Sequence, residues 1–109
     1  MDDEVVLLYT TWPNAETAEA FGALAVAERL AACANVISGM RSIYRWEGAV
    51  ERAAETVMIL KTTAALSPSL TERLIGEHPY DTPCAVALPV STVGSNPTFL
   101  GWVAANAAL

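Results

Sequence analysis

The apolar positions of the chain follow two different periods. Val5–Tyr9 is an unbroken run of strand length, which predicts a strand buried on both faces in the middle of a sheet. Asn14 is a favourable helix N-cap, and the apolar residues after it recur at helical spacing. They predict a helix of about 17 residues whose buried stripe is Ala18, Phe21, Gly22, Ala25, Val26 and Leu30.

The middle of the chain predicts a long β-hairpin. Cys33–Trp46 and Ala49–Thr62 both have the character of strands, and Glu47-Gly48 between them is a turn sequence. Ser42, Tyr44 and Trp46 share one face of the first arm because side chains alternate along a strand. Ser38-Gly39 is a site for a bend or a bulge.

The rest of the chain predicts a helix, a strand and a second helix. Ser67-Pro68 predicts an N-cap followed by a proline at the first helical position, and His78-Pro79 predicts the end of that helix. Cys84–Val90 predicts a fourth strand, in which Pro89 indicates a sheet edge or a bulge. Asn96-Pro97 predicts the start of a short last helix.

The predicted order is β-α-β-β-α-β-α. Two β-α-β halves around one hairpin are typical of the ferredoxin-like split-βαβ plan, an α+β fold with an antiparallel sheet and helices on one face. The length of 109 residues fits a single domain that spans residues 1–109.

The hairpin is too long for a small globule. Arms of 14 residues reach roughly 46 Å if straight, whereas a compact chain of this length is about 34 Å across. Strands that overhang the body leave backbone donors and acceptors unpaired, which favours pairing with another chain. We therefore expect a homo-oligomer that shares strands between subunits; the alternative is a monomer with a bent hairpin.

Composition and charge narrow the function. Hydrophobic residues make up 53% of the chain, and 12 acidic residues against 6 basic ones give a net charge of −6. An acidic chain is a poor binder of nucleic acid and of anionic membrane surfaces. The start Met1–Glu4 is acidic, whereas a signal peptide begins with positive charge. Two cysteines are too few for a disulfide framework, so we expect a cytoplasmic protein.

Several motifs resemble those of one known family. Glu28–Asn35 reads E-R-L-A-A-C-A-N, Ser42–Gly48 reads S-I-Y-R-W-E-G, and Lys61-Thr62 follows in order. His78–Pro83 reads H-P-Y-D-T-P, and Asn96–Trp102 matches the closing segment. In this order and spacing the motifs resemble the CutA divalent-cation tolerance proteins along essentially the whole chain.

The resemblance implies a ferredoxin-like homotrimer assembled by strand pairing between subunits. It also implies clefts between subunits similar to those of PII-type signalling trimers, and a role in tolerance of, or response to, divalent metal ions such as copper. The chain departs from the family at five positions, among them Phe99 and Gly101, which stand where a tyrosine and an aspartate are common. Cys84 replaces a common glutamate, and Tyr9 and Glu77 stand where some members carry a cysteine and a histidine.

His78 and Cys84 are the candidate metal ligands. A thiolate and an imidazole form a soft pair suited to copper(I) or zinc, although stable sites need three or four ligands. A neighbouring subunit could add Glu47 or Glu51. The alternative is a structural histidine with a buried, inert cysteine. No metal or other cofactor is required by any motif.

Lys61 is the only lysine, and it is a candidate anion-binding group in the cleft with Trp46, His78 and Tyr80. The alternative is a solvated strand end, or an ion pair with Glu55 or another acidic neighbour. An enzyme is the least favoured class, because a Cys-His nucleophile needs an orienting group and an oxyanion hole, and no motif supplies them. We expect a non-enzymatic trimer that binds a metal ion or a small anionic effector, or alternatively a structural trimer that acts through a protein partner.

Overall fold

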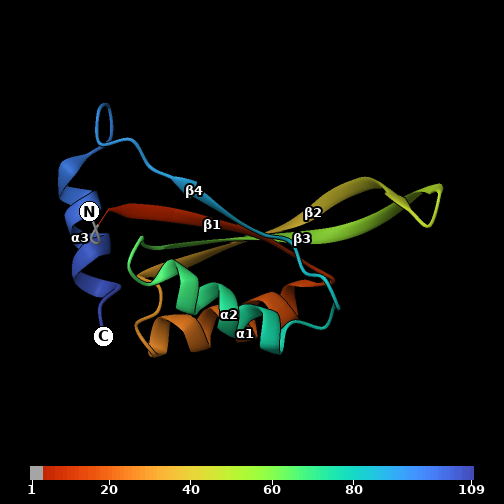
Figure 1. Cartoon of the computed structure of the whole chain (residues 1–109), viewed down its shortest axis with the longest axis horizontal. Coiled ribbons are helices and arrows are strands. Elements are labelled where there is room, and N and C mark those ends of the chain that lie inside the picture. The colour runs from red at the N-terminus through yellow and green to blue at the C-terminus, as the bar shows by residue number, and fades with distance from the viewer. Residues whose placement is uncertain (1–3) are drawn as a thin grey trace.

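The computed structural model describes residues 4–109, so the acidic start at residues 1–3 lies outside the described residues. The elements follow the predicted order (Figure 1). They are β1 (Val5–Trp12), α1 (Ala15–Ala27), β2 (Cys33–Trp46), β3 (Ala49–Thr63), α2 (Ser67–Glu77), β4 (Ala85–Pro89) and α3 (Pro97–Asn106).

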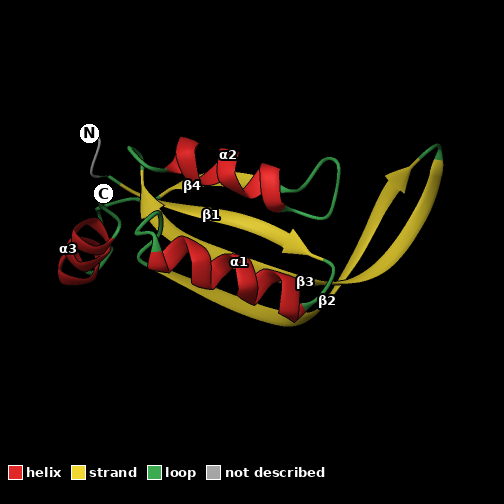
Figure 2. Cartoon of the chain, turned by 90° about the horizontal axis from the view of Figure 1, so that it is seen from below, coloured by secondary structure: helices red, strands yellow, loops and turns green. Residues whose placement is uncertain are grey.

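The strands form one sheet in the order β2-β3-β1-β4, and every neighbouring pair is antiparallel. This arrangement confirms the ferredoxin-like α+β plan. β1 is central, as its aliphatic run predicts, and β4 is an edge strand, as Pro89 predicts. Helices α1 and α2 cover one face of the sheet, and α3 lies at the end of the sheet where β1 begins (Figures 1 and 2).

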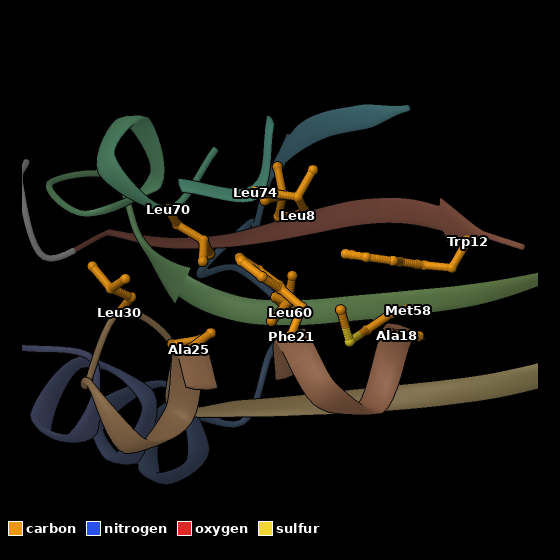
Figure 3. Close-up of a cluster of buried hydrophobic side chains, with 11 residues drawn as sticks. Leu8, Trp12, Ala18, Phe21, Ala25, Leu30, Met58, Leu60, Leu70 and Leu74 are labelled. Carbon is orange, nitrogen blue, oxygen red and sulfur yellow. The ribbon is translucent and has the colours of Figure 1, made fainter. Parts of the chain in front are cut away.

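The main core fills the space between the sheet and the two covering helices (Figure 3). Leu8, Met58 and Leu60 on the strands and Leu70 and Leu74 on α2 are fully buried. A second, smaller cluster joins α3 to the end of the sheet. Its buried members are Val5, Ala32, Val103 and Ala107. The protein therefore buries apolar side chains on the helix face and leaves the opposite face of the sheet without a helix.

Helix α1 is shorter than predicted. It ends at Ala27, and Val26, predicted in the buried stripe, is exposed. Arg29 adopts a left-handed conformation with φ 62°, its N–H bonds the carbonyl of Val26, and the N–H of Leu30 reaches back to Ala25. This Schellman-type turn ends the helix early and still delivers Leu30 to the core.

The predicted caps are confirmed at two helices and wrong at the third. The Asn14 side chain accepts the N–H of Thr17 at 2.9 Å, and the Asn96 side chain accepts the N–H of Thr98 at 3.0 Å. Ser67 is the first residue of α2 rather than its cap. The carbonyl of Leu66 already accepts the N–H of Leu70, which moves the cap position one residue earlier.

The hairpin overhangs the body as predicted. β1 ends at Trp12, which pairs with Thr56, so residues 49–55 of β3 have no partner on that side (Figure 1). The chain measures 44 × 28 × 21 Å along its principal axes. A bulge interrupts the pairing between Ile37 and Met40, at the predicted Ser38-Gly39, and Gly39 adopts φ +89° there.

Candidate functional site

His78 marks the point where α2 ends and the chain turns toward β4. Pro79 prevents the helix from continuing, and the N–H of His78 makes the last bond, to the carbonyl of Leu74. The imidazole is 8% exposed and packs against the indole of Trp12, with ring centroids 4.1 Å apart. The ring therefore belongs to the edge of the core rather than to the solvent.

Both ring nitrogens of His78 have partners. The backbone N–H of Tyr80 donates to Nδ1 over 3.0 Å, so Nδ1 is an acceptor. Nε2 then carries the proton and donates to the carbonyl of Thr11, 2.8 Å away. This assignment describes a neutral imidazole, and a metal ion could bind it only by displacing one of these partners.

Tyr80 connects the same segment to the hairpin. Its hydroxyl donates to Oε2 of Glu55 over 3.0 Å, and its ring lies 4.9 Å from that of His78. Burial, followed by the hydrogen bond to Glu55 and the charge of that carboxylate, raises the pKa of Tyr80 to about 12. Glu55 pairs with Met40 directly beside the bulge. We call Trp12, Glu55, His78 and Tyr80 the hinge cluster, because they meet where the hairpin leaves the body.

Lys61 lies far from the hinge cluster. Its Nζ is 5.2 Å from the centre of the Phe99 ring on α3, and Phe99 stacks on Trp102 at 5.7 Å. Lys61 is six positions after Glu55 on β3, which is about 20 Å of extended strand. Within residues 4–109 Lys61 has no ion pair, so the alternative of a pair with Glu55 is wrong for the single chain.

Trp46 lies at the tip of the hairpin, at the end of the molecule opposite to Lys61 and α3. It pairs with Ala49 and is 60% exposed. Of the four predicted cleft residues, the chain brings together only His78 and Tyr80. The sequence alone does not identify Glu55 and Trp12 as members of this cluster. The only signal for Glu55 is the pairing of the two hairpin arms, which places it opposite Met40 beside the bulge.

The cysteines are both half-buried and free. Cys84 directly precedes β4, and Cys33 begins β2 and pairs with Lys61. Within the part of the chain that the structure describes, no three histidine, cysteine or acidic side chains gather into a metal-binding group. The pairing of His78 with Cys84 as metal ligands stays a prediction.

The surface of residues 4–109 includes two hollows. The larger, about 740 Å³, lies between α1 and the outer edge of β2, and we call it the α1–β2 groove. Its lining residues are Glu19, Gly22, Ala23, Val26, Ala34, Asn35, Val36 and Ile37. The smaller, about 280 Å³, lies on the hairpin beyond the bulge and is lined by Arg41, Ser42, Ile43, Arg52, Ala53 and Ala54.

The sheet order, the overhanging hairpin and the helix at the sheet end define a ferredoxin-like α+β protein with an extended central hairpin. Residues 6–106 match the family model of the CutA1 divalent ion tolerance protein, and the chain belongs to that family. It is 42% identical over 104 residues to the divalent-cation tolerance protein CutA of Thermus thermophilus, covering 95% of this chain and 97% of the relative.

Solved structures agree with the family assignment. The CutA of Xylella fastidiosa superposes with a TM-score of 0.91 at 35% identity, covering 96% of this chain and 99% of the other. The divalent cation tolerance protein of Thermus thermophilus superposes with a TM-score of 0.90 at 38% identity, covering 95% of this chain and 99% of that structure. The family is one of non-enzymatic divalent-ion tolerance proteins, in agreement with the prediction from the motifs.

Relatives differ in length and in described location. The chain matches the chloroplastic CutA of Oryza sativa at 39% identity over 98 residues, which are 90% of this chain and 54% of the relative. The chain thus spans about half the length of such relatives. A CutA structure from Archaeoglobus fulgidus is described as periplasmic. Within residues 4–109, no helix is both long and apolar enough to span a membrane.

Proposed function

We propose that this protein acts in divalent-cation tolerance as a non-enzymatic homotrimer that responds to a metal ion such as copper through clefts between its subunits. The observation that carries the proposal is the match to the divalent ion tolerance family over residues 6–106. The free cysteines support a reducing, cytoplasmic location.

The unpaired strands support the assembly. β2 and β4 are both edge strands, and residues 49–55 of β3 lack a neighbour on the side of β1. The sheet face without helices exposes Ile37, Val86 and Leu88, whose exposed fractions are 53%, 50% and 45%. Backbone groups and apolar side chains left open in this way favour pairing with further copies of the chain.

The positions of the cleft residues also support an inter-subunit site. Trp46 ends β2 and pairs with Ala49 at the start of β3, whereas Lys61 lies near the other end of β3, about 40 Å away along the strand. A single subunit cannot bring them to one ligand. A cleft that contains all four residues therefore takes Trp46, Lys61 and the pair of His78 and Tyr80 from different subunits.

The ligand of the cleft is a metal ion or a small anion. For a soft metal, Cys84 and His78 supply a thiolate and an imidazole, and the imidazole binds after Tyr80 or Thr11 releases a nitrogen. For a small anionic effector, Lys61 is the charged group, next to the rings of Phe99 and Trp102. The departures from the family at Tyr9, Glu77 and Cys84 mean that this chain would hold a metal with a donor set of its own.

Sedimentation and calorimetry test the proposal. The purified chain is expected to sediment at micromolar concentration as three copies of 11.5 kDa, and a single-chain species would contradict the assembly. Copper(I) and zinc are then titrated into the trimer under reducing conditions. We expect binding heat that is lost in both His78→Ala and Cys84→Ser and kept in the matched control Cys33→Ser; equal heat in all variants would contradict these ligands.

A structural trimer that acts through a protein partner is the second candidate. The observation that favours it is the occupation of both His78 nitrogens, together with the absence of a three-ligand group within residues 4–109. A trimer that gives no heat with copper(I), zinc or small carboxylates and nucleotides would favour this alternative.

A further inference from the structure

Helix α3 carries two aromatic side chains that the core does not use. Its buried side is formed by Val103, which packs with Val5 and Ala107 at the end of the sheet. Phe99 and Trp102 lie about one turn apart, their ring centroids are 5.7 Å from each other, and they are 41% and 46% exposed. A stacked pair with open faces can take up a further flat ring.

Lys61 stands beside this aromatic pair without a counter-charge. Its Nζ lies 5.2 Å from the centre of the Phe99 ring, and the side chain is only half-buried. All its direct and diagonal cross-strand neighbours on the same face are uncharged: Val5, Leu7 and Tyr9 on β1, and Cys33 and Asn35 on β2. Within residues 4–109 Lys61 forms no ion pair, so an anion can bind its ammonium group without displacing a carboxylate.

The strand surface next to Lys61 is apolar. Leu7 pairs with Lys61 on one side and with Leu88 on the other, and directly paired residues point to the same face of a sheet. This is the face that α1 and α2 do not cover, and α3 stands at its end (Figure 1). We call Leu7, Lys61, Phe99 and Trp102 the α3 corner, because they lie where this open face of the sheet meets the helix.

The α3 corner selects a singly charged anion with a flat ring. One ammonium group is a point charge, whereas phosphate groups are usually held by several cations or by backbone N–H groups. The net charge of −6 also opposes a ligand more strongly as its negative charge grows. The surface beside the ammonium group is aromatic or aliphatic, so the rest of the ligand is apolar. A carboxylate attached directly to an aromatic ring meets both requirements.

We propose that the α3 corner binds an aromatic carboxylate, whose charged group pairs with Lys61 and whose ring packs on Phe99 and Trp102. The inference rests on the small anionic effector of the proposed function and names its chemical class. All of these groups belong to one chain. Lys61 is about 20 Å of strand away from Glu55 in the hinge cluster, so within one chain a metal ion at His78 and a carboxylate at Lys61 bind at separate places.

Titration of the purified protein with benzoate tests the proposal, followed by NMR of the indole N–H groups. Trp102 belongs to the α3 corner, whereas Trp12 is buried and its indole N–H donates to the hydroxyl of Thr10. We expect benzoate to shift the Trp102 resonance and to leave the Trp12 resonance unchanged. Cyclohexanecarboxylate carries the same charge on a saturated ring, and it should bind about threefold to tenfold more weakly than benzoate.

Three variants assign the two halves of the ligand. Lys61→Met removes the charge with an unbranched side chain, and it should weaken benzoate binding by about tenfold or more. Trp102→Leu should abolish the preference for benzoate over cyclohexanecarboxylate. Arg73→Gln is the matched control, because it removes a positive charge from α2 outside the corner, and it should bind benzoate like wild type. The amide spectrum of each variant checks that the fold is intact.

The outcomes separate this site from the rest of the proposed function. Benzoate that bound no more tightly than cyclohexanecarboxylate, or that bound Lys61→Met as well as wild type, would overturn the proposal. Inorganic phosphate that bound at Lys61 as tightly as benzoate would overturn the ligand class. A trimer that bound copper(I) or zinc but not benzoate would refute the α3 corner alone. A monomer whose benzoate binding depended on Lys61 and Trp102 would support the corner and contradict the assembly.

Discussion

His78 offers the sharpest test of the site, because its structural and ligand roles predict different results. Replacing it with phenylalanine keeps a flat ring against Trp12 and removes the bonds to Thr11 and to the N–H of Tyr80. Each buried hydrogen bond contributes about 1 kcal/mol, so we expect His78→Phe to lower the free energy of unfolding by about 2 kcal/mol.

His78→Ala adds the loss of packing. The alanine variant loses the ring contacts with Trp12 and Tyr80 at 4.1 Å and 4.9 Å in addition to the two hydrogen bonds. Aromatic contacts of this kind contribute about 1 kcal/mol each, and a small cavity adds to the loss, giving about 4–5 kcal/mol in total. The difference between the two variants measures the packing of the ring.

Urea unfolding of the metal-free protein is the assay, at one fixed protein concentration because dissociation would contribute to the transition. Ile75→Ala, at an exposed position of the same helix, is the matched control and should change the stability by less than about 0.5 kcal/mol. If His78→Phe were as stable as wild type, the reasoning from its two hydrogen bonds would be refuted. A variant with full stability that had lost only copper(I) or zinc binding would identify His78 as a ligand rather than a structural group.

Four further predictions follow from single contacts. Because the folded state raises the pKa of Tyr80 to about 12, the folded chain holds the phenol proton more tightly than the unfolded chain does. The stabilisation from this proton, less than about 1 kcal/mol at this exposed position, is present below pH 10 and disappears between pH 10 and 12. In a pH series of unfolding curves, Tyr80→Phe should remove this part of the loss of stability at alkaline pH. Gly39→Ala should destabilise by about 1 kcal/mol in thermal unfolding, because φ +89° disfavours a side chain, whereas Gly76→Ala in α2 should be neutral or stabilising. Arg29→Gly relaxes the left-handed backbone but removes the bonds to the carbonyls of Ala105 and Ala108, so hydrogen exchange at the end of α3 should quicken while that of α1 stays unchanged. Leu60→Ala, fully buried in the main core, should cost about 3–5 kcal/mol in urea, and a loss below 1 kcal/mol would contradict the packing in Figure 3.

Local preferences along the chain account for the order of the elements and for most of their ends. The order of elements, the caps at Asn14 and Asn96, the bulge at Ser38-Gly39 and the edge position of β4 all follow from preferences that act between near neighbours in the chain. The length of the hairpin arms also predicted the overhang, because strand length is additive along the chain. The motifs in their order indicate the family without any information on tertiary contacts.

Tertiary structure decided how distant segments meet. Tyr80 binds Glu55, and His78 binds the carbonyl of Thr11, because the path after α2 brings that segment over the end of β1 and the adjoining start of the overhang of β3. Lys61 lies over Phe99 because α3 packs against the end of the sheet. Such contacts depend on strand register and loop path over tens of residues, and local preferences carry no information about either. The separation of Trp46 from Lys61 has the same origin, and it makes any cleft containing both a property of several chains.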